Sequence, residues 1–473
     1  MTPRPVSLLR PLAAGALLAA AALAQAAPTL VGFAKMPAGT FADGPTSGQF
    51  QAAANGVTPP YVARQPVQGF SAVLHGPRAG TFYVMPDNGF GTKPNSPDYL
   101  LRLYAVEPDF RQAVGRHGRI VGSATVRPVG FRTGWPLRGF EGRQASLGRI
   151  TLSDPDRLIG FPIVADGEFY PYSGTGPGRA DIPVDAAIRE QRLLTGGDLD
   201  IESVRQDRHG NLWFGDEFGP FLVKTDRHGR VLRSAIPLPN SRGYGGLPLV
   251  QSPQSPLLAD AAQVNLRGSN GFEGLAINPA GTLLYALLEG PLIPDADQKR
   301  LLINEFDIDQ ERYTGRTWAY RLEAGGTNIG DMTAINDHEF LVIERNGIQG
   351  TQPNAADMFK KIYKIDLRKV GADGFVHKTE VVDLLKIGDP NDLDGDGRTT
   401  FDFPFVTIED VLPVDERTLL VINDNNFPGN GGRTTTAPDA TEFILVRLDE
   451  PLNLEPRSPL CRVFHAAPWC SSK

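Results

Sequence analysis

Four segments of this chain repeat one plan, and this repetition restricts the fold more than any other feature. Each has an acidic residue, a short apolar strand, an Asp or Asn that opens a turn, a second apolar strand and a closing acidic residue. The segments are 201–217 (IESVRQDRHGNLWFGDE), 272–289 (FEGLAINPAGTLLYALLE), 329–345 (IGDMTAINDHEFLVIER) and 407–425 (TIEDVLPVDERTLLVINDN). Because one such unit is too small to bury its own apolar face, the units must pack against one another.

A fifth and more degenerate copy occupies residues 69–91 (GFSAVLHGPRAGTFYVMPDNGFG). Irregularly spaced β-turn-β repeats indicate an all-β fold, a single β-propeller over residues 27–455. We expect six blades, with seven as the alternative, and we expect the weakly patterned stretch 122–197 to hold one of them. An open β-sandwich would not place an acidic residue at both ends of successive hairpins.

The N-terminus has the features of an export signal. Arg4 and Arg10 precede the apolar run Leu12 to Ala24, and Ala-Gln-Ala follows at 24–26. This order predicts a signal peptide over residues 1–26, cut after Ala26, and a secreted or periplasmic protein. The apolar run is too short to cross a membrane as a helix, so we expect no membrane association after cleavage.

Two cysteines, Cys461 and Cys470, lie in the C-terminal tail 456–473. An oxidising compartment favours a disulfide bond between them. The formal net charge of -7 gives no basic surface for nucleic acid, so we expect no nucleic-acid partner. We expect a monomer that acts on a small-molecule ester.

Arg-His-Gly occurs at 116–118, 208–210 and 227–229, and in one class of phosphatases this tripeptide supplies a histidine nucleophile. In the second repeat, Pro-Ala-Gly occupies the place of the copy at 208–210. A β-turn favours Asp or Asn at its first position, Pro at its second and Gly at its fourth. We therefore predict that His209 and His228 lie at turn tips rather than in a catalytic site.

The repeated acidic residues are the main candidates for function. The innermost strands of a propeller converge on a central channel, so residues at equivalent positions form rings. The opening acids Glu202, Glu273, Asp331 and Glu409 would form one ring, and the closing acids Asp216, Glu217, Glu289, Glu344 and Asp424 a second. Such carboxylates repel one another unless cations lie among them, and oxygen ligands in this number suit Ca²⁺. Alternatively, some acids cap strand ends or pair with Arg205 and Arg345.

The chain resembles the phytase-like family described as having esterase-like activity. The resemblance rests on residues 198–232 (DLDIESVRQDRHGNLWFGDEFGPFLVKTDRHGRVL), 271–292 (GFEGLAINPAGTLLYALLEGPL), 403–426 (FPFVTIEDVLPVDERTLLVINDNN) and 85–91 (MPDNGFG). It implies a calcium-associated propeller that hydrolyses phosphoric or carboxylic esters, with Glu202, Asp216, Glu217, Glu273 and Glu409 as its catalytic residues. The lysine-rich phosphate motifs of true β-propeller phytases are missing, which argues against phytate as the substrate.

A separate calcium-binding motif lies at 389–403 (DPNDLDGDGRTTFDF). Asp392, Asp394 and Asp396, followed by Gly397, fit the opening of a calcium loop, although Phe403 stands at the twelfth position in place of glutamate. We expect a stabilising calcium site between blades. The alternative is a solvated polar turn.

Metal-activated water is the simplest mechanism for this sequence, because no Gly-x-Ser-x-Gly motif supplies a serine nucleophile. Glu202, Glu273, Asp331, Glu409 and Asp424 are the expected ring ligands of Ca²⁺. Arg345 and Lys93, with Asp87 and Asn88 of the Asp-Asn-Gly-Phe-Gly segment, are the expected substrate-binding residues. Three hypotheses stay open: a calcium-dependent phosphoesterase, a metal-dependent lactone or carboxylic ester hydrolase, and a non-catalytic binding propeller.

Overall fold

The computed structural model describes residues 28–115, 118–129, 148–171 and 182–455. The predicted signal peptide and both cysteines lie outside these residues, as does His117. Within them, no helix combines the length and the apolar character that a membrane span requires.

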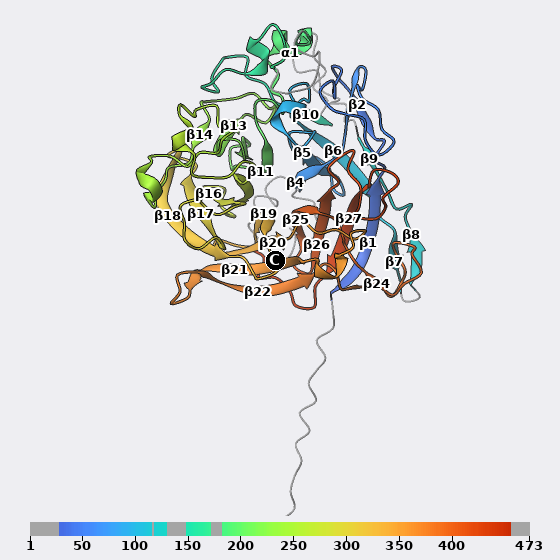
Figure 1. The fold of residues 1–473 in the computed structure, drawn as a ribbon. Helices are drawn as coiled ribbons and strands as arrows, with labels where there is room; N and C mark the ends of the chain where they lie inside the picture. Colours follow the sequence, from blue (N-terminus) through green and yellow to red (C-terminus); the bar gives the residue numbers. More distant parts are fainter. Residues whose placement is uncertain (1–27, 116–117, 130–147, 172–181, 456–473) are drawn as a thin grey trace, which may run out of the picture.

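Five groups of antiparallel strands, similar in design, account for most of the described chain (Figure 1), and we refer to each group as a sheet. Three are separate four-stranded sheets, whereas the first and the last are joined by a parallel contact between their outer strands. In chain order they contain β4 (Phe70–His75), β5 (Phe82–Pro86) and β6 (Arg102–Asp109), with β9 (Thr125–Pro128) and β10 (Arg149–Thr151) paired to β6; β11 (Ile201–Gln206), β12 (Leu212–Asp216), β13 (Phe221–Thr225) and β14 (Ile236–Pro237); β15 (Phe272–Ile277), β16 (Leu283–Leu288), β17 (Arg300–Asp307) and β18 (Arg312–Arg321); β19 (Asn328–Ala334), β20 (Glu339–Arg345), β21 (Lys360–Val370) and β22 (Val376–Asp383); and β25 (Thr407–Asp415), β26 (Thr418–Asp424), β27 (Thr441–Arg447) and β1 (Thr29–Met36).

Short elements connect these sheets. They are the hairpins β2 (Phe41–Asp43) with β3 (Arg64–Pro66), β7 (Gln112–Val114) with β8 (Arg119–Val121), and β23 (Ile387–Gly388) with β24 (Thr400–Phe401), the helix α1 (Ala186–Gln191), and 3₁₀ turns at Lys93–Asn95, Val164–Asp166, Tyr244–Gly246, Ala261–Gln263 and Ala355–Asp357. Asp185 caps α1 by accepting a hydrogen bond from the Ala187 amide at 2.8 Å.

The five sheets close into a ring. Each innermost strand, in the order β4, β11, β15, β19 and β25, contacts the next, and β25 contacts β4. An apolar cluster fills each of the five interfaces between neighbouring sheets. On β12, for example, the buried Trp213 packs toward the third sheet and the buried Phe214 toward the first, since successive strand residues face opposite sides. The fold is therefore a β-propeller.

The expected number of six blades is not borne out, because the described residues form five. The stretch 122–197 was expected to hold a further blade, but its described parts supply the outer strands β9 and β10 of the first sheet and the helix α1. Since β4 contacts β11 directly, no blade is inserted between them.

The two ends of the propeller domain meet in one sheet. β1 pairs antiparallel with β27, from Thr29 opposite Arg447 to Met36 opposite Thr441, and so completes the fifth sheet. Figure 1 shows this seam as a blue strand beside red strands. The first strand of the domain thus holds the ring closed.

Candidate functional site

Near the start of each innermost strand one residue is bulged out of the ladder, and these five positions are equivalent. They are Ser71, Glu202, Glu273, Gly330 and Glu409. A bulge bends the strand and redirects the extra side chain. Three glutamates thereby approach one another near the channel axis. The serine hydroxyl completes this level by donating to Glu409 Oε2 at 3.0 Å.

A second set of equivalent positions lies where the second strand of each sheet ends. These positions hold Asp87, Glu217, Glu289, Arg345 and Asp424. The set contains four acids and one arginine, and the arginine belongs to the same sheet whose bulge residue is Gly330. A Cβ at Gly330 would lie 2.0 Å from the Ile408 carbonyl oxygen, so the close approach of the fifth sheet requires glycine there.

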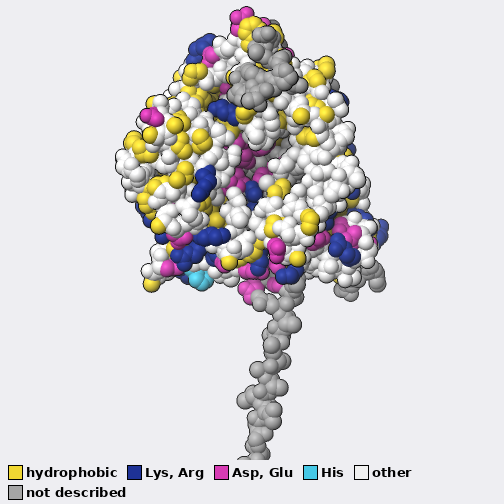
Figure 2. Space-filling model, in the orientation of Figure 1, with side chains coloured by type: hydrophobic (Ala, Val, Ile, Leu, Met, Phe, Trp, Pro, Cys, Tyr) yellow, Lys and Arg dark blue, Asp and Glu magenta, His cyan; other side chains and the backbone are white. Residues whose placement is uncertain are grey.

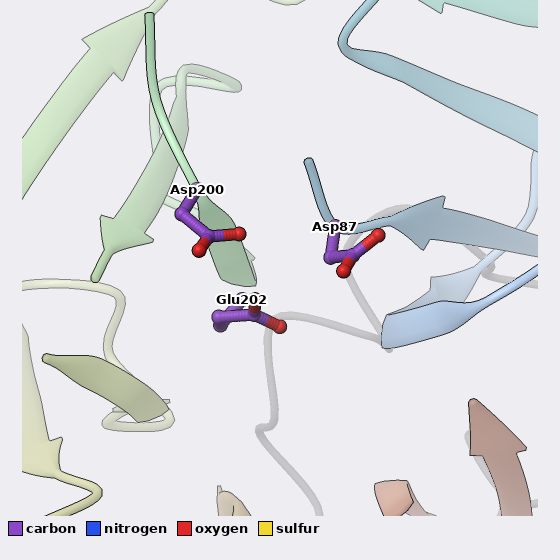
Figure 3. A group of neighbouring side chains, drawn as sticks. All are labelled: Asp87, Asp200 and Glu202. Atoms are coloured by element: carbon purple, nitrogen blue, oxygen red, sulfur yellow. The ribbon is translucent and has the colours of Figure 1, made fainter. Parts of the chain in front are cut away.

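The carboxylates form two groups that share one member. Asp87, Asp200 and Glu202 each offer an oxygen within 4.8 Å of the others, and so do Glu202, Glu217 and Glu273. Figure 3 shows the first group, with Asp87 at the end of β5 and the other two residues at the start of β11. Glu202 therefore lies between two sets of oxygen donors.

Arg345 supplies the positive charge beside this cluster. Its Nη2 lies 2.9 Å from Glu409, 3.1 Å from Glu289 and 3.4 Å from Glu273. Asp87, Asp200, Glu202, Glu217 and Asp424 form no ion pair within the described residues. Three of these eight carboxylates thus share one guanidinium, and five have no ion-pair partner among the described residues. Glu217 Oε1 is also buried without a hydrogen-bond partner.

Burial is the main cause of the shifted pKa values at this cluster. It raises the pKa of Glu202, Glu217 and Glu273 well above the ordinary range, and neighbouring carboxylates raise these values further. Burial raises the pKa of Glu289 to about 7 against the opposing effect of Arg345, and burial with Glu409 raises that of Asp424 to about 8. Burial alone would lower the pKa of Arg345, but the adjacent carboxylates hold it above its ordinary value.

The cluster reaches the surface through a small cavity. The cavity has a volume of about 90 Å³, and Asp87 and Asp424 line it beside the rings of Phe90, Tyr99 and Phe427. Figure 2 shows acidic side chains gathered at the centre of this face, where the surface is hollowed. The lining thus combines two carboxylates and three aromatic rings with the side-chain amides of Gln51, Gln68 and Asn426.

Several residues expected in the rings have other places. Asp331 follows the bulge by one residue and pairs with Arg205 at 2.9 Å. The prediction placed Asp331 in the ring because it is the opening acid of its repeat, but in β19 the bulged residue is Gly330. Asp216 accepts hydrogen bonds from the amides of Asp200 and Gly219, at 2.9 and 2.6 Å, and so fixes the turn after β12.

Glu344 and Lys93 also differ from their expected roles. Glu344 lies one residue before the ring position, where it contacts Tyr320 and Lys378 at 2.5 and 2.7 Å. Lys93 donates to the Gln254 carbonyl at 3.0 Å and lies over the Phe218 ring. Burial lowers the pKa of Lys93, against the effect of Asp216. Lys93 is therefore near the acids but does not ion-pair with them.

Asp200 was missed by the sequence analysis. It precedes Glu202 by two residues, and alternate residues of an extended segment share a face. That spacing in Asp-Ile-Glu is the signal that could have identified it. Asn88, expected to bind substrate, instead donates from Nδ2 to Asp200 Oδ1 at 2.8 Å and so orients this carboxylate.

The loop at 389–403 also differs from the predicted ligand set. Asp389, Asp392 and Asp394 each offer an oxygen within 4.8 Å of the others, whereas Asp396 pairs with Arg398. Because Asp389 lies outside the matched D-x-D-x-D-G pattern, the sequence analysis did not include it.

The Arg-His-Gly copies at 208–210 and 227–229 form turns, as predicted. Asp207 accepts the His209 amide at 2.8 Å, and Asp226 accepts the His228 amide at the same distance. Both histidines are exposed, on the connections that follow β11 and β13. Neither is part of the central cluster.

The fold and the site define a class of protein, a five-bladed propeller with buried carboxylates at its centre. The particular family follows from comparison with known proteins. Residues 65–427 match the phytase-like family, described as "Esterase-like activity of phytase", and the chain belongs to this family.

Individual relatives are distant. A protein of Arthroderma benhamiae described as an uncharacterized secreted protein is 26% identical over 190 residues, which cover 37% of this chain and 36% of that protein. The match thus spans about a third of that relative's length.

Solved structures with partial similarity include a luciferin-regenerating enzyme, with a TM-score of 0.34, 11% identity and coverage of 82% of this chain and 97% of that one. They also include a calcium-binding regucalcin of Agrobacterium tumefaciens, with a TM-score of 0.32, 12% identity and coverage of 83% and 95%.

Proposed function

We propose that this protein is an exported calcium-dependent hydrolase of a small phosphate ester. The observation that carries the proposal is the pair of carboxylate groups that share Glu202, in a cluster of seven buried acids and the half-buried Asp87 beside one arginine. Buried like charges at these distances are tolerated only when they are protonated or neutralised by cations.

The donor set suits calcium. All five residues of the two groups offer carboxylate oxygens, and Glu217 Oε1 is a buried oxygen without a partner. Calcium takes hard oxygen ligands in flexible arrangements. Asp87, Asp200 and Glu202 would hold one ion, and Glu202, Glu217 and Glu273 a second. Bound calcium would neutralise an anionic ester and lower the pKa of a water molecule.

The remaining residues orient groups or carry protons. Arg345 holds Glu273, Glu289 and Glu409 in place, and its buried guanidinium is occupied by these carboxylates. Asp424 lines the cavity and belongs to neither proposed ligand group. Burial and the neighbouring Glu409 raise the pKa of Asp424, which favours its protonated form, and a protonated Asp424 would be able to donate to a leaving group.

The aromatic rings that line the cavity support a second candidate, a hydrolase of lactones or carboxylic esters. Phe90, Tyr99 and Phe427 would contact an uncharged acyl or aryl group, whereas a phosphate needs positive charge close by. The family's description as esterase-like is consistent with either candidate.

A substrate panel tests the proposal. Aryl phosphates, phosphodiesters, lactones and aryl esters would each be incubated with the protein in calcium and in chelator. We expect phosphate release that stops in chelator. Hydrolysis of lactones or aryl esters alone would replace the first candidate by the second, and no turnover on any compound would favour a binding propeller.

A further inference from the structure

The loop between β23 and β24 carries an acidic cluster far from the central carboxylates in the fold. Asp389, Asp392 and Asp394 bring one oxygen each to within 4.8 Å of one another. Asp389 is fully buried, and its Oδ1 has no hydrogen-bond partner. An unpaired buried carboxylate oxygen is costly, so this atom points to a missing ligand.

The nearby basic residues have other partners. Arg398 pairs with Asp396 and, at 3.1 Å, with Asp402. Arg433 pairs with Glu442 at 2.8 Å and with Asp402 at 3.3 Å. None of the three clustered aspartates forms an ion pair within the described residues. They therefore lack a direct ion-pair partner, and Arg433 attracts only Asp394, from beyond ion-pair distance.

The backbone of the loop brings these carboxylates together. Asp389 Oδ2 accepts the Leu393 amide at 2.6 Å, and Asp392 Oδ1 accepts the Gly397 amide at 2.9 Å. Gly395 and Gly397 have φ angles of 81° and 82°, a conformation that favours glycine. These two glycines permit the sharp turns that bring the three aspartates together, as in known calcium-binding loops.

The loop also contacts the strand that closes the propeller. Gly388, directly before Asp389, pairs with Thr29 of β1 and donates its amide to the Pro28 carbonyl at 2.9 Å. Leu393 from within the loop is buried in the same apolar cluster as Leu30 and Phe33 of β1. An ordered loop therefore supports β1 from its outer side, opposite to its pairing with β27.

We propose that Asp389, Asp392 and Asp394 bind a divalent cation, calcium, and that this ion locks the seam between β1 and the rest of the ring. Asp396 is not a ligand, because Arg398 holds it. The role is structural and stands independently of the proposed catalysis.

The test must distinguish calcium bound by this loop from calcium bound by the central carboxylates. All variants are therefore made in a Glu202→Gln background, because Glu202 belongs to both central groups. Into it we would introduce Asp389→Asn with Asp394→Asn, and separately Asp396→Asn as a matched control. Melting temperature would be measured in calcium and in chelator, and calcium stoichiometry by titration calorimetry.

At about a hundredfold excess over the dissociation constant, calcium should raise the melting temperature of the background and of the control by about 3 °C for a chain of this size. The double variant should lose this rise and one bound ion. Equal calcium shifts in the double variant and the background, or loss of the shift in Asp396→Asn, would overturn the proposal.

A second measurement stays informative if the double variant does not fold. Amide hydrogen exchange of Thr29–Met36 would be followed in the otherwise unmodified protein and in the single variant Asp394→Asn. Chelator should accelerate exchange at β1 in the unmodified protein and change it little in Asp394→Asn. Exchange at β1 that is the same in calcium and chelator for the unmodified protein would also overturn the proposal.

Discussion

At the scale of single residues, two sets of structurally equivalent positions form the centre of this propeller, and the residue types within each set differ from sheet to sheet. The bulge set has glutamate at three of its five places, and the strand-end set has acids at four. The sheet with Gly330 at its bulge contributes Arg345 at its strand end. One sheet thus provides the positive charge that the acids of its neighbours need.

The first prediction concerns Glu202, which both carboxylate groups share. Changing a residue that only orients a metal ligand typically costs about 10–100-fold in metal affinity or activity. Glu202 is itself a proposed ligand, so Glu202→Gln should reduce turnover by about 100-fold or more. Its melting temperature in chelator should not fall, because one buried repulsion is relieved. Steady-state kinetics and thermal melts measure both effects.

Glu344→Gln is the matched control for this experiment. It removes an acid that closes the same kind of repeat but bonds to Tyr320 and Lys378. It should lower stability and leave turnover per folded molecule unchanged. Equal turnover in Glu202→Gln and the parent protein would remove the shared carboxylate from the mechanism.

The second prediction concerns Arg345. Breaking a buried ion pair from one side costs about 3–5 kcal/mol, because the remaining charge is left unpaired. Arg345→Gln should therefore lower the free energy of unfolding by about that much in chelator, and by less in calcium. Denaturant titrations in both conditions measure the difference. A loss that is the same with and without calcium would show that no cation binds at Glu273, the one partner of Arg345 that belongs to a proposed calcium group.

At the scale of elements, each hairpin combines a bulge at its inner end with a side-chain-stabilised turn at its outer end. Asp207 accepts the amides of His209 and Asn211 and the buried indole N–H of Trp213, the last at 3.0 Å. Asn278 stabilises the corresponding turn of the next sheet by accepting hydrogen bonds from the amides of Thr282 and Leu283. Asp and Asn at this place determine the turn, whichever residues follow them.

The third prediction compares two changes in that turn. Asp207→Ala should lower the free energy of unfolding by about 1–3 kcal/mol, because the indole N–H of Trp213 loses its partner in the core. His209→Asn, two residues away with its side chain 58% exposed, should leave both stability and turnover nearly unchanged. Chemical denaturation and kinetic assays on the two variants measure this. A large loss of turnover in His209→Asn with an intact fold would contradict the turn assignment.

At the scale of the whole molecule, the ring closes only if charged residues pack at its axis, and this links stability to pH and cations. Burial raises the pKa of Asp216 to about 7 and, with Glu409, that of Asp424 to about 8. A carboxyl with a raised pKa binds its proton more tightly in the folded state. Its contribution to stability is complete below the unfolded pKa and is lost as pH rises through the folded value.

The fourth prediction follows from this sign. In chelator, the contribution of these carboxyls should be complete below the unfolded pKa of about 4, and the melting temperature should fall as pH rises from there through about 7 to 8. Calcium should restore stability chiefly at the alkaline end, where the carboxylates are ionised and able to bind it. Thermal melts across pH, with and without calcium, measure the effect. A calcium effect that is as large at pH 5 as at pH 8.5 would argue against binding by these carboxylates.

The sequence by itself determined the β-propeller, the turns and most of the central acids, because these depend on local patterns. Strand alternation, turn residues and the recurrence of Glu202, Glu273 and Glu409 at one place in the repeat are all visible in one dimension. Only the tertiary structure decided the number of blades, since ring closure depends on how β4 and β11 meet across a poorly patterned stretch. It also decided which acids face the axis. A bulge moves the inward position by one residue, which excludes Asp331, admits Arg345 and leaves Asp200 beside Glu202.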